Sequence, residues 1–481
     1  MAIYHLTASV ISRARGHRIV AIAANHSGTK LRDDYYGITH NHSQKAGVLH
    51  VEILAPAESP AWVRERALLW NRVEAAEHRK DSQLARALEI SLPLELSNEQ
   101  NIELLREYLV QGFVRHGMVA DFSVRCITIG NPHANVLLTL RAVSPEGFGL
   151  KARHWNRKNN ILEWRAAWAE CTNRHLARAG HDIRIDHRSL EGQQIELVAG
   201  RRTGIKGTRS LGRKLPNHLQ QRIDDRQRIA AENGAAMIED PSLALRAIAR
   251  QRNRFTEAHL VQFLRSRTAD TEQLEAVRQG IMNSPELVAL AVATGEAIHF
   301  TSRDLVEAEK SLMRRVAIMS LRGIKKEPPG HTYTSVAQPL DESSLIHYLI
   351  SGGDFKALKT PTDTNKYKLL TAASKFWHAQ GHRIMGVALS NRAVADFQAL
   401  HIDACTWVSF DQAWLDGQDL FASSHVIVVM GAEMIALKSL ERIIAAADKL
   451  RAKLVLMVDA EQFVGTLSPL HSLIVTYGPR A

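Results

Sequence analysis

Apolar and polar positions alternate over several short stretches in the first part of the chain, and between these stretches apolar positions recur every three or four residues. Alternation predicts strands, and the longer period predicts helices with one buried face. The predicted strands cover residues 3–11, 48–54, 84–92, 119–126 and 135–141. The predicted helices cover residues 18–26, 61–78, 97–116 and 160–179. This mixed order predicts an α+β domain built on an antiparallel sheet.

The pattern changes in the second half of the chain. It is wholly helical from about residue 226 to residue 321, and a break at residues 325–339 contains two adjacent prolines. Beyond the break, apolar strand-like runs alternate with helical runs. The strand-like runs cover residues 383–389, 426–430 and 454–458, and the helical runs cover residues 391–400 and 436–450. Such alternation is typical of βαβ units and predicts a parallel sheet.

These patterns divide the 481 residues into four predicted parts. They are an α+β domain (1–200), a basic linker (201–225), a helical region (226–340) and an α/β lobe (341–481). No run of 18 apolar residues occurs, so no transmembrane helix is predicted. The three cysteines lie far apart in sequence and suggest no disulfide framework, which fits a reducing cytoplasm.

The net charge of +11 is concentrated in one stretch of the chain. Residues 151–223 hold 16 Lys and Arg against 6 Asp and Glu, whereas residues 1–150 hold 16 against 15. A local basic surplus of this kind indicates a polyanionic partner, most often nucleic acid. A solvated basic face is the alternative interpretation.

The first 200 residues contain a series of phrases that together resemble one family. The phrases include GVLHVEILAP, ALEISLP, MVADF, GNPHANVLLTLRA and HLARAGHDIRIDHRSLEGQ. Through them the N-terminal part resembles the MobA/MobL family of plasmid mobilisation relaxases. The rest of the chain resembles the longer TraA-type relaxase–helicases of Ti-type conjugative plasmids, through EDPSLALRAIARQRNRFTEAHL and AAADKLRAKLVLMVDAEQ. The resemblance implies a His-hydrophobe-His nuclease-like fold for residues 1–200, a helicase N-terminal-like region at 226–340 and a truncated RecA-like lobe at 341–481.

The resemblance also implies a reaction, site-specific nicking at the origin of transfer of a plasmid. In this family a tyrosine attacks a phosphodiester of single-stranded or hairpin DNA and stays linked to the 5′ phosphate. A divalent metal (Mg²⁺ or Mn²⁺), held by three histidines, polarises the scissile phosphate. Other plasmid-transfer proteins are implied as partners, and no membrane contact is implied.

This chain departs from the family pattern at the nucleophile and at two metal ligands. Asn25 stands where the family keeps its tyrosine, and an amide cannot act as the nucleophile. Of the three expected ligand positions His133 is retained, whereas the other two are Arg125 and Asn135. Two unit charges 4 Å apart repel by about 4 kcal/mol at an effective dielectric near 20, and a divalent ion about doubles that energy. We therefore expect no tight metal binding, although Glu89 stands where the family keeps a glutamate.

Candidate DNA contacts lie in the basic stretch, where aromatic and basic side chains could stack on bases and pair with phosphates. The candidates are His154, Trp155, Arg157, Lys158, Arg184 and Arg188. For Arg184 and Arg188, a salt-bridged corner that packs the last helix of the domain is the alternative interpretation.

A degenerate phosphate-binding loop lies at residues 360–367. Lys366 is retained, but both glycines of the GxxxxGK[ST] pattern are absent, and Tyr367 replaces the hydroxyl residue that binds Mg²⁺. The Asp-Glu pair expected after a later strand is Met430-Gly431. We therefore expect no ATP turnover.

Three interpretations of function follow from these features. The favoured one is a conjugative-transfer protein that keeps the relaxase fold and its DNA surface but is impaired or inactive in nicking and ATP hydrolysis. The second is an active relaxase that uses Tyr35 or Tyr36, which lie ten and eleven residues beyond Asn25. The third is a non-enzymatic structural or regulatory remnant of the transfer complex.

Overall fold

The fold is known from a computed structural model. It describes residues 4–126, 132–193, 195–198, 217–290, 297–322, 342–360, 366–418, 420–421, 425–459 and 469–479. Most of the predicted basic linker, residues 201–216, lies outside these ranges. No helix within them has both the length and the apolar composition needed to cross a bilayer.

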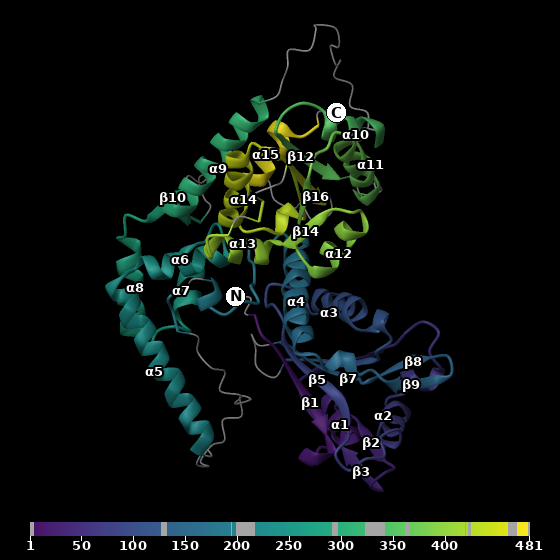
Figure 1. Cartoon of the computed structure of the whole chain (residues 1–481). Helices are drawn as coiled ribbons and strands as arrows, with labels where there is room; N and C mark the ends of the chain where they lie inside the picture. The colour runs from purple at the N-terminus through teal and green to yellow at the C-terminus, as the bar shows by residue number, and fades with distance from the viewer. Residues whose placement is uncertain are drawn as a thin grey trace. The chain divides into compact units, whose positions relative to one another are not determined.

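The N-terminal part is built on an antiparallel five-stranded sheet of order β1-β5-β7-β6-β4 (Figure 1). The strands in this order are β1 Leu6–Ser12, β5 Gln83–Ser91, β7 His133–Thr139, β6 Ala120–Arg125 and β4 Val48–Leu54. The predicted antiparallel sheet is therefore confirmed, with each strand within three residues of its predicted bounds.

Helices cover both faces of this sheet (Figure 1). On one face, α1 Ile19–Ser27 and α2 Arg66–Ala75 share a buried cluster with Ile11, Ala85 and Leu137 of the strands. On the other face, α3 Asn98–Gly112 and α4 Lys158–Arg178 contact the strand side chains that point the opposite way. A capping box begins α3, because Ser97 Oγ accepts a bond from the backbone N–H of Gln100 and the Gln100 side chain accepts one from the backbone N–H of Ser97.

Two short hairpins of the N-terminal part were not predicted from the sequence. They are β2 Lys30–Asp33 with β3 Ile38–Asn41, and β8 Arg141–Ser144 with β9 Gly147–Lys151. Strands of four or five residues contain only about two alternations, too few to stand out from a loop. Short 3-10 turns complete this part, at η1 Arg13–Arg15, η2 Ala61–Arg64, η3 Val114–His116, η4 Arg153–Asn156 and η5 Glu191–Gln193.

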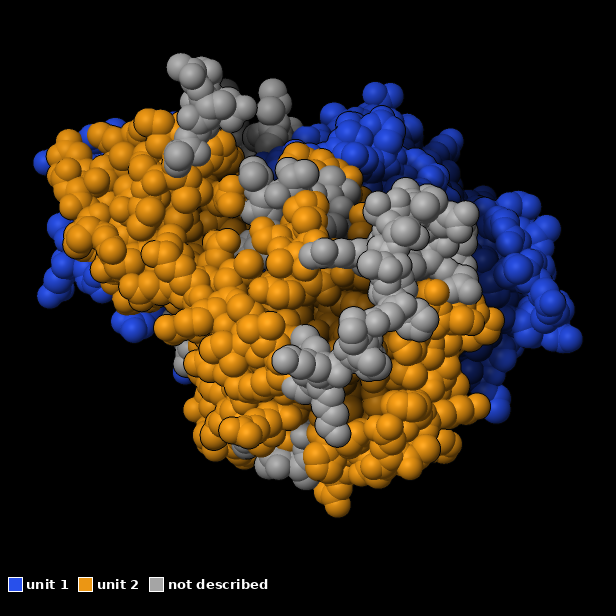
Figure 2. All heavy atoms as spheres, turned by 90° about the horizontal axis from the view of Figure 1, so that it is seen from above, with its two compact units in different colours: residues 1–176, 184–240, 261–277 blue, residues 177–183, 241–260, 278–481 orange. Residues whose placement is uncertain are grey.

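The chain forms two compact units, coloured separately in Figure 2. One comprises residues 1–176, 184–240 and 261–277, and the other comprises residues 177–183, 241–260 and 278–481. The middle helices are α5 Asn217–Glu239, α6 Ser242–Gln251, α7 Glu257–Leu264, α8 Thr271–Met282 and α9 Arg303–Leu321. The prediction of a wholly helical region was wrong, because β10 Leu287–Leu290 pairs with β11 His299–Ser302. These runs of four residues are too short for their period to be read.

The second unit contains a five-stranded sheet of order β12-β16-β15-β13-β14, all parallel. The strands are β12 Phe355–Thr360, β16 Lys453–Asp459, β15 Val426–Met430, β13 Ile384–Ala388 and β14 Asp403–Thr406. Its helices are α10 Glu342–Ile350, α11 Lys366–Ala379, α12 Asn391–Ala399, α13 Trp407–Leu415, α14 Leu437–Leu450 and α15 Pro469–Tyr477, with a 3-10 turn at η6 Ala432–Met434. The predicted parallel sheet is confirmed, although β12 and β14 were not predicted.

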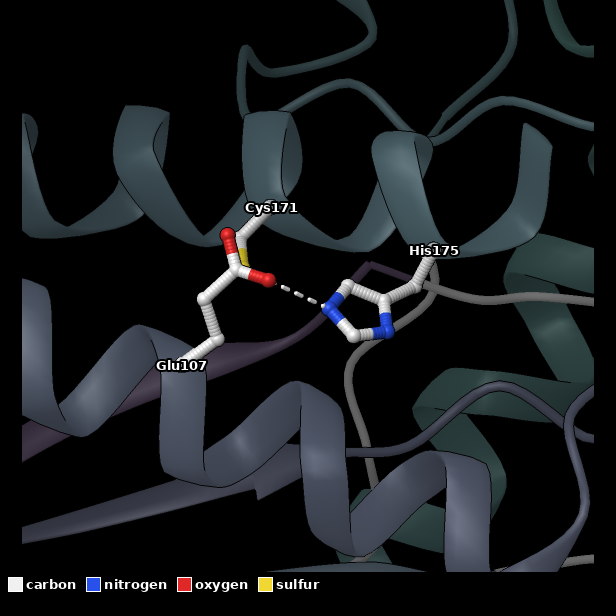
Figure 3. Close-up of side chains that lie close together, drawn as sticks. All are labelled: Glu107, Cys171 and His175. Atoms are coloured by element: carbon white, nitrogen blue, oxygen red, sulfur yellow. Dashed lines mark hydrogen bonds and ion pairs between the residues drawn. The ribbon is translucent and has the colours of Figure 1, made fainter. Parts of the chain in front are cut away.

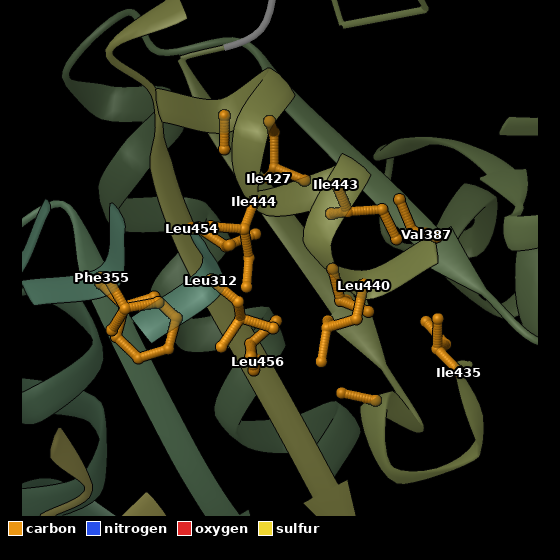
Figure 4. Packing of buried hydrophobic residues seen from close by; sticks show 14 of the residues in the cluster. Leu312, Phe355, Val387, Ile427, Ile435, Leu440, Ile443, Ile444, Leu454 and Leu456 are labelled. Atoms are coloured by element: carbon orange, nitrogen blue, oxygen red, sulfur yellow. The ribbon is translucent and has the colours of Figure 1, made fainter. Parts of the chain in front are cut away.

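Apolar side chains of α9 and α14 pack on one face of the parallel sheet (Figure 4). Leu312 of α9 and Ile443 and Ile444 of α14 are fully buried there, against Leu454 and Leu456 of β16. The continuous apolar runs of these strands are typical of parallel strands covered on both faces.

A buried polar network ties α2 to β6 in the N-terminal sheet. Asp121 accepts two bonds from Arg66 Nε and Nη2 at 2.8 Å each, and a third at 2.8 Å from Trp70 Nε1. Substituting Asp121→Ala leaves a largely buried guanidinium and a buried indole N–H without an acceptor. We expect a loss of about 3–5 kcal/mol in the free energy of unfolding of this unit, measured by chemical denaturation.

The matched control for this network is Arg106→Ala. Arg106 pairs with Glu52 at 2.9 Å, but its side chain is 42% exposed. Loss of this ion pair should lower the free energy of unfolding by less than about 1 kcal/mol. Equal losses in the two variants would contradict the assigned role of Asp121.

Candidate functional site

The residues expected at the family's metal site come together at one end of the N-terminal sheet. Arg125 of β6 lies directly opposite His133 of β7, and Asn135 lies between Ser123 of β6 and Glu89 of β5. Residues two apart on a strand share a face, so all five side chains point to the face covered by α1 and α2. We call this group the strand-end cluster.

Asn25 lies near the same end of the sheet, in the last turn of α1. Lys45 donates from Nζ to both the backbone and the side-chain oxygen of Asn25. Gly28 ends the helix in the left-handed region, at φ 65°, where a Cβ would come 3.1 Å from Val48 Cγ2. Because Val48 pairs with Arg125, the end of α1 lies beside the strand-end cluster.

Apart from Glu89, which is exposed, the strand-end cluster is buried and rich in hydrogen-bond donors. Arg125 is 2% exposed, His133 6% and Asn135 8%. Arg125 Nη2 makes one long bond of 3.5 Å to the carbonyl of Ala46, and burial lowers the pKa of its guanidinium. Within the described residues, Arg125 Nε, Asn135 Nδ2 and Ser123 Oγ have no hydrogen-bond partner, and Arg125 has no ion-pair partner.

Ser123 and Lys45 were not identified from the sequence. Ser123 could have been, because it precedes Arg125 by two residues on a predicted strand and so shares its face. Lys45 gave no such signal, since it lies in the loop between β3 and β4 and reaches Asn25 only in the folded chain.

Tyr35 and Tyr36 are not brought to this cluster. They lie in the turn between β2 and β3, with their rings against Arg13 and Arg18 at 4.7 and 4.6 Å. Arg13 follows Ser12, which pairs with Gln83, whereas the cluster begins at Glu89 on the same strand. Six residues of strand span about 20 Å, so the two tyrosines lie toward the opposite end of the sheet.

A divalent metal does not fit the strand-end cluster. His133 is its one ordinary ligand for such an ion beside the exposed Glu89, and the buried guanidinium of Arg125 lies directly across from it. Among the described residues, the group of three side chains that could hold a metal is Glu107, Cys171 and His175.

That group lies between α3 and α4, on the other face of the sheet (Figure 3). Glu107 Oε2 is 2.8 Å from His175 Nε2, and its Oε1 accepts a bond of 2.7 Å from Arg174. Burial raises the pKa of the Cys171 thiol to about 12, which favours the neutral thiol. These contacts link the two helices through an ion pair. Because the group lies on the other face of the sheet, it cannot complete a metal site with His133.

The candidate DNA contacts are placed unequally. His154 and Arg157 are exposed on and just after η4, but Trp155 is 7% exposed and its carbonyl accepts a bond from Arg86. The side chain of Lys158 lies outside the described residues. Stacking of Trp155 on a base would require its ring to leave the core.

The other two candidates lie in the segment after α4. Arg188 donates to Asp186 Oδ2 at 3.0 Å from Nε and 2.7 Å from Nη2, and to Oδ1 at 3.2 Å from Nε, whereas Arg184 is half-buried. Asn173 of α4 holds the same segment through two bonds to the backbone of Ile185. This is the salt-bridged corner of the alternative interpretation, at least for Arg188.

The described residues of the predicted degenerate phosphate-binding loop lie at the carboxyl edge of the parallel sheet, where open α/β sheets bind ligands. Lys366, the first residue of α11, pairs with Asp459 Oδ2 at 3.0 Å. Thr360 and Asp459 end two adjacent strands, and Tyr367 donates to Asp396 at 2.8 Å. Residues 361–365 of the loop lie outside the described residues.

Comparison with known proteins gives two matching family models. The one described as "MobA/MobL family" matches residues 18–213, and the one described as "AAA domain" matches residues 342–470. A "Probable conjugal transfer protein TraA" from Sinorhizobium fredii is 30% identical over 96% of this chain and 46% of its own length. A "Mobilization protein MobL" from Acidithiobacillus ferridurans is 36% identical over 42% of this chain and 62% of its own.

A chain in a solved structure described as "Molecular Basis of Vancomycin Resistance Transfer in Staphylococcus aureus" also matches. It is 33% identical, with a TM-score of 0.38, over 39% of this chain and 100% of its own. This 481-residue chain spans about half the length of the TraA relatives that it matches.

Proposed function

Because residues 18–213 belong to the MobA/MobL family and 96% of this chain is similar to a TraA protein, we propose that it binds DNA in conjugative transfer without nicking it. The proposed fold of the N-terminal part is the His-hydrophobe-His nuclease-like one. The proposed partner is single-stranded or hairpin DNA of an origin of transfer, together with other plasmid-transfer proteins.

One observation above all supports the loss of nicking. Arg125 is buried directly opposite His133, at a position where the family would hold a metal ligand, and it has no carboxylate partner among the described residues. A fixed positive charge there opposes a divalent cation. Asn25 beside the same cluster offers an amide where the reaction needs a hydroxyl.

An active relaxase that uses Tyr35 or Tyr36 is less well supported. Both rings lie about 20 Å along the sheet from Glu89, against Arg13 and Arg18. A nucleophile has to reach the phosphorus atom that the cluster positions, within about 3–3.5 Å. The hairpin would have to leave its contacts with α1 to do so.

DNA binding is expected to depend on salt. If about five phosphates are neutralised, the slope of log K against log salt should be near −3.5 for single strands. Substituting the exposed Arg157→Glu should weaken binding and make the slope shallower. Fluorescence anisotropy with the full chain and single-stranded origin DNA, at several salt concentrations and without metal, measures both quantities.

The matched control for this measurement is Arg32→Glu. Arg32 is an exposed arginine of the same unit, on the β2–β3 hairpin and outside the basic stretch. This substitution should leave the affinity for single-stranded DNA nearly unchanged. If the full chain shows no salt-dependent binding at low ionic strength, the non-enzymatic remnant becomes the better interpretation.

A further inference from the structure

We propose that the strand-end cluster binds a phosphate oxyanion, with the guanidinium of Arg125 in the place of the family's metal. The anion would be a backbone phosphate of the bound single-stranded DNA. The inference deepens the proposed function and rests on it for the source of the phosphate, but the binding chemistry is a property of the cluster itself.

The first support for this proposal is an electrostatic imbalance. Arg125 is 2% exposed, its Nε has no acceptor, and its one bond, to Ala46, is long. A charge held out of water without an opposite charge is among the least favourable groups in a protein. Since no described carboxylate pairs with Arg125, an anion from outside the chain would supply the missing charge.

The second support is the kind of groups that surround Arg125. The unpartnered atoms beside it are the amide nitrogen of Asn135 and the hydroxyl of Ser123, and both can donate to an oxyanion. Ser123 and Asn135 are direct partners across β6 and β7, one pleat from Arg125 and His133. Directly opposite side chains in such a pair are about 5 Å apart at Cβ, a span that one phosphate group can bridge.

The charges facing the cluster favour an anion over a cation. Lys45 lies on the same side and reaches Asn25, and Arg125 provides the buried positive charge. Glu89, opposite Asn135 on β5, is the acidic residue of the cluster, and it is exposed to solvent. A guanidinium has up to two N–H edges for phosphate oxygens, which makes arginine the preferred partner of phosphate.

The test uses the full chain and two small probes. Inorganic phosphate presents the oxyanion alone, and a thymidine dinucleotide presents one phosphodiester of DNA. Calorimetric titration and thermal unfolding, against sodium chloride at matched ionic strength, should show binding of both probes and a higher Tm with each. Mn²⁺ in phosphate-free buffer should leave the Tm unchanged.

The discriminating variant is Arg125→Met, which removes the charge and keeps the length of the side chain. It should abolish the rise in Tm with either probe, and its Tm in phosphate-free buffer should be at or above that of the wild type. The matched control is Arg86→Met. Arg86 is also buried, but it points to the other face and has a carbonyl acceptor. This control should keep the response to phosphate.

The outcomes separate this inference from the proposed function. Phosphate binding that is equally tight in Arg125→Met, or no binding of either probe, overturns the inference, and salt-dependent DNA binding by the same protein would leave the proposed function standing. Binding of inorganic phosphate but not of the dinucleotide overturns DNA as its source. Arg125-dependent binding of both probes without any binding of single-stranded DNA supports the site and contradicts the proposed function.

Discussion

Incubation of the chain with single-stranded origin-of-transfer DNA and Mn²⁺ should yield no covalent protein–DNA adduct. The reaction needs a hydroxyl nucleophile and a metal-bound phosphate, and on the proposed correspondence with the family Asn25, Arg125 and Asn135 replace the nucleophile and two metal ligands. Removal of a nucleophile alone has cost about 10⁶-fold in rate in a well-studied protease. The measurement is a denaturing gel with labelled DNA, on which a covalent adduct keeps the label on the protein.

Reversal of the three changes gives the companion experiment. Asn25→Tyr, Arg125→His and Asn135→His together restore the hydroxyl and three histidines at one end of one sheet face, and could restore nicking. Each single reversion should stay inactive, because nucleophile and metal act as one unit. A stable adduct of the unmodified chain that disappears in Tyr35→Phe or Tyr36→Phe would show that the β2–β3 hairpin supplies the nucleophile after all.

Alternation along the strands carried most of what the sequence could predict about this site. Residues 133 and 135 share a face of β7, although the predicted strand began only at residue 135, and antiparallel pairing brought Arg125 across from His133. What the sequence could not give is the absence of a partner for Arg125, since that depends on every neighbour in three dimensions. The burial of Trp155 depends on tertiary contacts in the same way, whereas Arg188 pairs with Asp186 only two residues away, as one of the two interpretations of that segment expected.

Element length decided which parts of the fold the sequence predicted. The sequence predicted strands of five to nine residues in β1, β4, β5, β6, β7, β13, β15 and β16, whereas six strands of four residues were missed in β2, β3, β8, β10, β11 and β14. Periodicity needs several repeats to exceed chance, and these strands offer two. β12 was missed at six residues, because Lys356 and Lys359 break its apolar run. Among the helices, α10, α11, α13 and α15 were not predicted.

The two altered centres differ in how their charge is arranged. In the N-terminal unit the positive charge of Arg125 stands, on the proposed correspondence, where the family would bind a cation, and it has no carboxylate partner in the described structure. In the second unit the positive charge of Lys366 already has a partner, because Asp459 holds it at 3.0 Å. A phosphate would satisfy the first arrangement, whereas it would have to displace a carboxylate in the second. We therefore expect phosphate ligands to bind at Arg125 and not at Lys366.

ATP should bind the chain with a Kd above about 1 mM, or less than roughly 4 kcal/mol of binding free energy at a 1 M standard state. A functional phosphate loop wraps the nucleotide with backbone amides that glycines make accessible, and residues 360–367 contain no glycine. ATP would also have to compete with Asp459 for Lys366. Calorimetric titration of the full chain with ATP and Mg²⁺ measures the affinity directly.

Two substitutions make this expectation specific to the site. Lys366→Ala should change neither ATP affinity nor ATP hydrolysis, since the lysine is already neutralised by a carboxylate. Lys368→Ala is the matched control, because Lys368 lies on the same helix, is 67% exposed and pairs with Glu342. Micromolar ATP binding that is lost in Lys366→Ala and kept in Lys368→Ala would mean that the loop still forms a nucleotide site. In that case ATP would displace Asp459 as the ion-pair partner of Lys366.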